Sequence, residues 1–194
     1  ATVQILDREG LDAATTTRIA EAAGVSIGSL YQYFSHRDAV LKALQEREFE
    51  RTLAMMQRVL ADVHLEDAPE QTVLDVLRSL AELYMESPGL HRVLAIEGLR
   101  VAKAENVHAF DLRVIDLVRH FLTVTKAPIA RRNVEAAAFI VYQSVRATML
   151  AYLLERPPGL DKEGLIEELG ELVRGYLLPG AGRGQGRAKK NGKR

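Results

Sequence analysis

The chain has 194 residues, of which 47% are hydrophobic and 27% charged, a balance typical of an ordinary globular protein. It contains no cysteine, which excludes a disulfide framework and a thiolate metal site. No apolar run reaches the ~18 residues that a membrane-spanning helix needs, and no signal-peptide pattern opens the sequence. We therefore expect a cytoplasmic protein without a membrane partner.

The net charge of zero conceals an uneven distribution. Residues 183–194 hold six of the 26 basic residues and no acidic one, which leaves 20 bases against 26 acids elsewhere. Residues 1–47 carry five bases and six acids. A basic domain often marks a nucleic-acid-binding protein, and this chain lacks one. A DNA-binding function must therefore rest on a motif.

Apolar residues recur at helical spacing along nearly the whole chain, and no stretch alternates as a half-buried strand would. The predicted fold class is all-α, with about nine helices. The first helix is expected to end at Gly10. The second is capped by Thr15 or Thr16 and stops at Gly24, and the third is capped by Ser26.

Six longer helices are expected after these. Ser35 with Asp38 is interpreted as a capping box for the first of them, and Asp161 as the N-cap of the last. Residues 179–194 contain five glycines and hardly an apolar side chain, which predicts a disordered basic tail. The expected spans are about 35–62, 67–86, 87–105, 109–124, 130–155 and 161–178.

Residues 15–34 are interpreted as two short helices joined by a tight turn. Gly24 accepts the left-handed backbone that such a turn requires. An αα-hairpin of this shape is common, so the shape alone leaves DNA binding open. The side chains expected in the core of the unit are Ile19, Ala20, Ala23, Val25, Leu30 and Phe34.

The second of these helices exposes small and polar residues in the half that enters the major groove in helix-turn-helix proteins. Gly28 permits close backbone approach. Ser29 and Gln32 can exchange hydrogen bonds with base edges, and Ile27 can touch a thymine methyl group. The neighbouring tyrosines are either phosphate contacts or plain surface aromatics.

About 35 residues resemble the N-terminal signature of TetR-family regulators. The matching positions are Gly10, Thr16, Ile19, Ala20, Ala23, Gly24, Val25, Ser26, Gly28, Ser29, Leu30, Tyr31, Tyr33, Phe34, Arg37, Asp38, Val40 and Leu41. The resemblance implies base contacts from Ser26, Ile27, Gly28, Ser29 and Gln32. It implies phosphate contacts from Thr16, Thr17, Tyr31, Tyr33 and Arg37. It also implies that helix one begins some ten residues upstream. Either its start lies outside this sequence, or the arm that contacts phosphates there was never present.

The expected domains are a helix-turn-helix unit over 1–46 and a ligand-binding and dimerisation unit over 47–178. Small residues recur along the eighth expected helix, and the ninth has more apolar surface than one neighbour needs, which favours a homodimer through both. An ordinary monomer core is the alternative. The residues concerned are Ala136, Ile140, Ser144, Ala147 and Ala151, and then Leu165, Ile166, Leu169, Leu172, Val173, Tyr176 and Leu177.

The resemblance further implies that helices five to eight enclose a small-molecule effector. Arg146 could meet an anionic head group, pair with Glu97, or lie on the surface. The candidate lining residues, each as readily plain core, are Tyr84, Glu97, Phe110, Phe121, Phe139, Tyr142, Gln143 and Arg146.

No catalytic grouping or cofactor motif is apparent. No convincing metal site is apparent either. The candidates for one are typical of solvated charges on a helix, namely the pair Asp116 and His120 and the set Glu105, His108 and Asp111. The predicted function is a ligand-responsive repressor that binds a palindromic operator as a dimer. The effector could release the protein from DNA or act as a co-repressor. The rival functions are a helical ligand carrier or enzyme, and an interaction module without DNA binding.

Overall fold

The computed structural model describes residues 1–61, 69–101, 104–125, 129 and 131–178, with no description of the side chains at 69, 70, 99, 101 and 104. Over these residues the chain forms helices and no strand, as predicted. The helices are α1 (Thr2–Arg8), α2 (Thr16–Ala23), α3 (Ile27–Tyr33), α4 (Arg37–Ala61), α5 (Pro69–Glu86), α6 (Pro88–Val101), α7 (Ala104–Val124), α8 (Val134–Glu155) and α9 (Lys162–Leu177).

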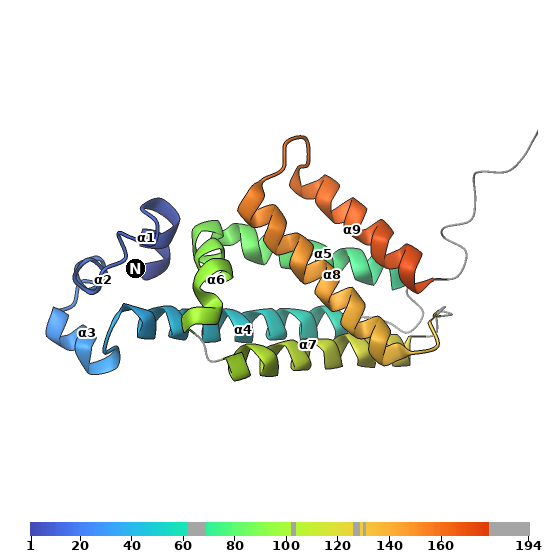
Figure 1. Ribbon diagram of the computed structural model, residues 1–194, viewed down its shortest axis with the longest axis horizontal. Helices are drawn as coiled ribbons and strands as arrows, with labels where there is room; N and C mark the ends of the chain where they lie inside the picture. The colour runs from blue at the N-terminus through green and yellow to red at the C-terminus, as the bar shows by residue number, and fades with distance from the viewer. Residues whose placement is uncertain (62–68, 102–103, 126–128, 130, 179–194) are drawn as a thin grey trace, which may run out of the picture.

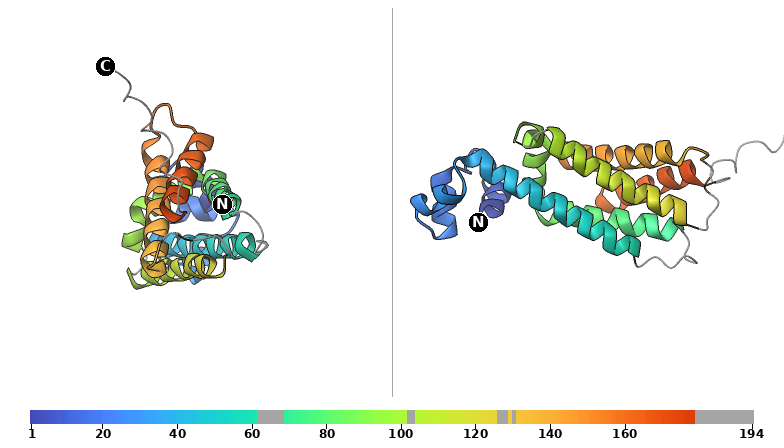
Figure 2. Two further views of the ribbon diagram at one scale, coloured as in Figure 1. Left: turned by 90° about the vertical axis from the view of Figure 1, so that its right-hand side faces the viewer. Right: turned by 90° about the horizontal axis from the view of Figure 1, so that it is seen from below.

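The molecule is elongated, with the short helices α1–α3 at one end (Figure 1). The long helix α4 leaves this end directly after α3 and runs along the bundle, with α5 above it and α7 below it in the view of Figure 1. Figure 2 shows the same course from two further sides. It packs against α5, α6 and α7, and α9 packs against α5. One helix therefore joins the N-terminal unit to the body.

The turn between α2 and α3 forms as the sequence predicts. The hydroxyl of Thr15 accepts a hydrogen bond from the Arg18 amide at 3.2 Å, and that of Ser26 accepts from the Ser29 amide at 3.0 Å. Gly24 adopts the left-handed conformation, with φ of 69°. Thr15 thus fixes where α2 begins, Gly24 where it ends, and Ser26 where α3 begins.

Two expectations about the core of this unit are wrong. Val25 is 45% exposed, and Ala23 is also exposed. The core of the unit is completed from α1 and α4, because Leu6 and Leu41 are buried in the same cluster as Ile19. Side chains from outside the hairpin therefore contribute to this core in addition to Ile19, Ala20 and Leu30.

Helix α6 belongs to the same core. Its Leu90 and Val93 are buried with the apolar residues of α1, α2 and α4. The Asp7 carboxylate accepts hydrogen bonds from the amides of Gly89 and Leu90, at 2.7 and 3.2 Å. A helix from the segment predicted as the second unit thus packs directly on the first.

Several helix starts differ from prediction. The ring of His36 accepts from the Ala39 amide, and Asp38 bonds Arg100 instead of closing a capping box. Helix α7 begins five residues earlier than expected. Helix α8 begins after Asn133, whose side chain caps it. The Asp161 cap is confirmed. Asp62, Asp67 and the tail 179–194 lie outside the described residues.

The apolar face of α9 is mostly used within the chain. Leu165, Ile166 and Leu169 pack against α5, and Val173 and Leu177 pack against α7 and α8. These five residues are at most 4% exposed, so the monomer-core alternative holds for them. Of the apolar residues assigned to a dimer face on this helix, Leu172 is the one with a largely exposed side chain, at 52%.

Helix α8 is long and apolar enough to cross a membrane by length and composition alone, with a mean hydropathy of 1.3 over its most apolar window. One third of that window is buried inside the molecule. A core helix of a globular protein passes the same criterion, so the finding says little about a membrane.

Candidate functional site

The residues predicted to contact DNA gather at the end of the molecule formed by α2, α3 and the start of α4. Eight of the ten are exposed, whereas Thr16 and Arg37 are half-buried. Tyr33 is 80% exposed, Tyr31 51% and Ile27 40%. A large apolar or aromatic side chain held so far out of the core by a short helix is available to a partner.

Hydrogen bonds within this surface join two pairs of side chains. The hydroxyls of Thr16 and Tyr31 lie 3.2 Å apart and join α2 to α3. The hydroxyls of Ser26 and Ser29 lie 2.8 Å apart. Ser26 also caps α3, so its oxygen has a structural role in addition to the predicted contact.

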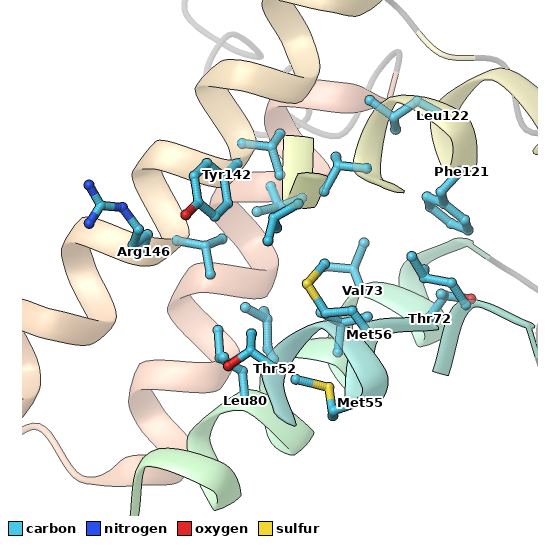
Figure 3. Close-up of a pocket in the computed structure, with 18 of the residues that line it drawn as sticks. Thr52, Met55, Met56, Thr72, Val73, Leu80, Phe121, Leu122, Tyr142 and Arg146 are labelled. Carbon is cyan, nitrogen blue, oxygen red and sulfur yellow. The ribbon is translucent and has the colours of Figure 1, made fainter. Parts of the chain in front are cut away.

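A mostly apolar cavity of about 110 Å³ lies between α4, α5, α7, α8 and α9. Tyr142 and Arg146 are at one end of it, and Phe121 and Leu122 at the other (Figure 3). Five of the eight residues predicted to bind an effector line this cavity, namely Tyr84, Phe110, Phe121, Tyr142 and Arg146.

The two tyrosines of the cavity stay neutral. Burial raises the pKa of Tyr84 to about 12. Burial and the hydrogen bond that the Tyr142 hydroxyl donates to Asp111 raise the pKa of Tyr142 further. These groups can therefore offer hydrogen bonds without charge.

The structure does not bring the other three predicted residues to the cavity. Glu97 is half-buried on α6, pairs with Arg100 at 2.5 Å and does not line the cavity. Phe139 is 51% exposed on α8, and Gln143 is half-buried without lining the cavity. The carboxylate closest to Arg146 is that of Asp111, at 4.0 Å, so pairing with Glu97 is wrong.

Sequence reasoning missed the contribution of α4. Thr52 and Met56 line the first cavity. Gln45, Glu48 and Thr52 line a second, more polar cavity of about 160 Å³ between α4, α5, α6, α7 and α8. The signal was present: three polar residues at helical spacing on the buried face of α4. Thr52, Tyr84, Phe110 and Arg146 line both cavities.

The acidic and histidine side chains on α7 do not converge on a metal. Asp116 bonds Arg119 at 2.8 Å, and Asp111 accepts from Tyr142. In the part of the chain that the structure describes, no three histidine or carboxylate side chains gather as ligands would.

Two family models match the chain. Residues 1–44 match "Bacterial regulatory proteins, tetR family", and residues 68–177 match "Tetracyclin repressor-like, C-terminal domain". The second model alone covers more than half of the sequence.

Curated relatives are similar to part of the chain. The nucleoid occlusion factor SlmA of Haemophilus influenzae is 30% identical over 147 residues, which cover 75% of this chain and 64% of that protein. SlmA of Actinobacillus pleuropneumoniae is 36% identical over 86 residues, 44% of this chain and 41% of that protein. The chain thus spans less than two thirds of the length of these relatives.

Solved structures share the fold. The fatty acid degradation regulator FadR from Bacillus halodurans has a TM-score of 0.70 at 17% identity, over 90% of this chain and 94% of that one. FadR from Bacillus subtilis in complex with stearoyl-CoA has a TM-score of 0.70 at 16% identity, over 90% and 95%. The helix-turn-helix geometry, the family models and the shared fold agree. The chain therefore belongs to the TetR family of bacterial regulatory proteins.

Proposed function

We propose that this protein is a transcriptional repressor that binds a palindromic operator as a homodimer and is released by a small-molecule effector. The observation that carries the proposal is the position of α4. It lines both cavities and follows directly after the helix expected in the major groove. As a bacterial DNA-binding regulator, the protein would act in the cytoplasm.

The contacts with DNA are proposed to divide into two sets. Ser29 and Gln32, with the backbone at Gly28, would read base edges, because they lie exposed on α3. The hydroxyls of Tyr31 and Tyr33 would bind phosphates, which position a protein without reading sequence. We assign Ser26 and Ile27 to the first set, and Thr16, Thr17 and Arg37 to the second.

The effector signal is proposed to travel through two rigid connections. The first is α4 itself. The second is α6, which lines the polar cavity and binds the N-terminal unit at both of its ends. Asp7 caps its start, and Arg100 near its end pairs with Asp38 at 2.7 Å. A ligand that shifts either helix would change the spacing of the two recognition helices in a dimer, and operator affinity with it.

The dimer is proposed to form through the exposed face of α8 together with Leu172 of α9. Ala136, Phe139, Ile140 and Ala147 are exposed on α8. Phe139 and Ile140 follow Ala136 by three and four residues, and Ala147 follows Ile140 by seven, so the four form one apolar stripe. Two such stripes around a two-fold axis would cover each other. The two-fold axis of the dimer would also relate the two recognition helices, as a palindromic operator with half-sites ~34–36 Å apart requires.

The effector is proposed to bind in the two joined cavities. Their size and their few polar groups fit a small apolar molecule with one polar end. The Bacillus subtilis regulator of the same fold was solved in complex with stearoyl-CoA, which supports ligand binding by this fold.

A titration of labelled promoter DNA by fluorescence anisotropy tests the DNA contacts. The promoter fragment of the protein's own gene should bind with an affinity that falls as salt rises. Tyr31→Phe should weaken binding to all sequences by a similar factor. Ser29→Ala and Gln32→Ala should change which sequence is preferred. Tyr176→Phe, far from this surface, is the control.

One result would count against the repressor and another against the assignment of its DNA contacts. One is the absence of sequence-specific binding to any promoter fragment of its own operon. The other is an identical effect of Tyr31→Phe, Ser29→Ala and Gln32→Ala, which would contradict the division into base and phosphate contacts.

A further inference from the structure

His36 lies in the turn between α3 and α4, at a position to which the resemblance to the TetR family assigns no role. Its ring caps α4, because Nδ1 lies 3.2 Å from the amide nitrogen of Ala39. The same amide is 3.1 Å from the His36 carbonyl oxygen, and such shared donors are common at the ends of helices. His36 therefore takes the capping place that the sequence assigned to Ser35.

The cap fixes what the rest of the His36 ring can do. The Ala39 amide can only donate, so Nδ1 accepts and carries no proton in this arrangement. The proton of the neutral ring is then on Nε2, which makes Nε2 a hydrogen-bond donor. Nε2 has no partner among the described residues, and the side chain is exposed. This edge of the ring is therefore free to donate to a molecule outside the chain.

Asp38 is the acidic side chain that interacts with His36, and arginines already balance its charge. Two guanidinium nitrogens of Arg100 lie 2.7 and 3.2 Å from its oxygens, and Nε of Arg37 lies 3.8 Å away. The hydrogen bonds from Arg100 hold the pKa of the Asp38 carboxyl below its usual range. With two cations beside it, this carboxylate opposes an anion near His36 only weakly.

His36 also stands between two residues that we assign to phosphates. Tyr33 ends α3 three residues before it, and Arg37 begins α4 directly after it. A helix whose N-terminal half reads base edges leaves the major groove through its C-terminal end, so the residues that follow pass close to the sugar-phosphate backbone. Phosphate oxygens accept hydrogen bonds, which is what a free Nε2–H group requires.

Resting on the DNA binding proposed above, we infer that His36 is a further phosphate-contacting residue, which donates from Nε2 to the operator backbone while Nδ1 caps α4. The ring would then tie the start of α4, the helix that lines both cavities, to a fixed point on the DNA. The competing roles are a helix cap without a DNA contact and a contact with a base edge.

Two substitutions separate the cap from the DNA contact. His36→Ser keeps an N-cap, because a serine hydroxyl accepts from the same Ala39 amide, but the side chain is too short to replace Nε2. His36→Ala removes both functions. We therefore expect His36→Ser to unfold at a higher temperature than His36→Ala.

DNA affinity should follow a different order. In fluorescence anisotropy at pH 7.5, we expect both variants to bind the promoter fragment of the protein's own gene at least ~10-fold more weakly than the parent, because a dimer loses two hydrogen bonds to charged groups. A scrambled duplex of the same length should lose a similar factor, since phosphates carry no sequence information. His120→Ser, exposed on α7, is the matched control and should bind both duplexes as the parent does.

The DNA supplies a second, independent probe. Promoter duplexes that each carry one methylphosphonate remove the charge of one phosphate at a time. We expect one position in each half-site at which this change weakens binding by the parent and leaves binding by His36→Ser unchanged, because the variant has already lost the contact.

Three results would overturn the inference and leave the repressor standing. One is a His36→Ser variant that regains parental DNA affinity together with stability, which makes His36 a cap alone. Another is a loss confined to the promoter fragment, which makes His36 a base contact. The third is a His36→Ser variant that responds to every methylphosphonate as the parent does. A parent chain that binds no promoter fragment of its own operon instead contradicts the proposed function, and this inference with it.

Discussion

Gly24 shows how one residue sets the geometry of the DNA-binding end. Its φ of 69° is a conformation that most L-residues avoid, and no atom lies within 4 Å of where a Cβ would stand. A substitution there meets only backbone strain. We expect Gly24→Ala to lower the free energy of unfolding by ~1 kcal/mol and Gly24→Asn by less, because Asn tolerates this conformation. Urea denaturation of the two variants provides the comparison, and equal losses would point to a steric cause.

His91 gives the protein a specific dependence of stability on pH. Its pKa in the folded state is lowered by burial, among Glu48, Arg51, Asp7 and the Ser87 carbonyl. Between the lowered pKa and the ordinary value of 6.5, the unfolded chain binds a proton that the folded chain does not. Stability therefore falls as the pH drops through this window, and is restored as the pH rises.

Replacing His91 by Gln should remove this component. Urea denaturation at pH 7.5 and 5.5 measures how much unfolding free energy is lost as the pH falls. We expect this loss to be smaller in His91→Gln than in the parent. His120→Gln, on the exposed side of α7, is the control and should keep the parent's dependence. An unchanged dependence in His91→Gln would mean that other groups carry it.

At the scale of single residues, prediction from sequence succeeded where the signal is local. Thr15, Gly24 and Ser26 act within four residues of themselves, and their roles follow from residue type and spacing. Gln45 and His91 come from helices far apart in the sequence. Nothing in the residues around either one indicates that both will be buried at the same cavity.

At the scale of helices, α1 and α6 approach each other closely at Gly89. A Cβ on Gly89 would lie 2.5 Å from the Asp7 Cα and 2.5 Å from the Leu6 carbonyl oxygen. Both atoms belong to the backbone, so α1 and α6 would have to separate. We expect Gly89→Ala to lower the free energy of unfolding by about 2 kcal/mol.

The control for this change is another helical glycine with open space around it. Gly175 on α9 has nothing within 4 Å of its Cβ position, so Gly175→Ala should stabilise the protein slightly through helix propensity. Chemical denaturation measures both. Similar effects at the two positions would show that α1 and α6 do not pack as closely as described.

Helix starts, too, are predicted correctly where a residue acts on its near neighbours and wrongly where it bonds a partner distant in the sequence. Asp161 lies directly before α9 and caps it, as predicted. The Asp38 side chain instead bonds Arg100, which lies 62 residues away, so the expected capping box does not form. A cap predicted from spacing fails when a distant partner offers its side chain a stronger bond.

At the scale of the whole molecule, composition cannot tell a monomer core from a subunit interface. The apolar residues of α9 were expected to meet a second subunit, and five of them are buried by α5, α7 and α8 instead. That packing depends on the tertiary arrangement. The exposed stripe on α8 emerges only once these intrachain contacts are known, and it includes Phe139, which was expected in the ligand cavity.

Phe139→Glu tests the dimer and the operator geometry together. The substitution places two like charges near the two-fold axis and removes two aromatic side chains from the interface, each worth about 2 kcal/mol of burial. We expect sedimentation equilibrium to show a monomer. A monomer should bind one half-site as well as before and lose the added affinity for the full palindrome, because its recognition helix is no longer linked to a second one.

Ile96→Glu, 66% exposed on α6 and outside the stripe, should stay dimeric. A dimeric Phe139→Glu would move the interface away from α8, and a monomer that keeps full palindrome affinity would separate DNA binding from dimerisation.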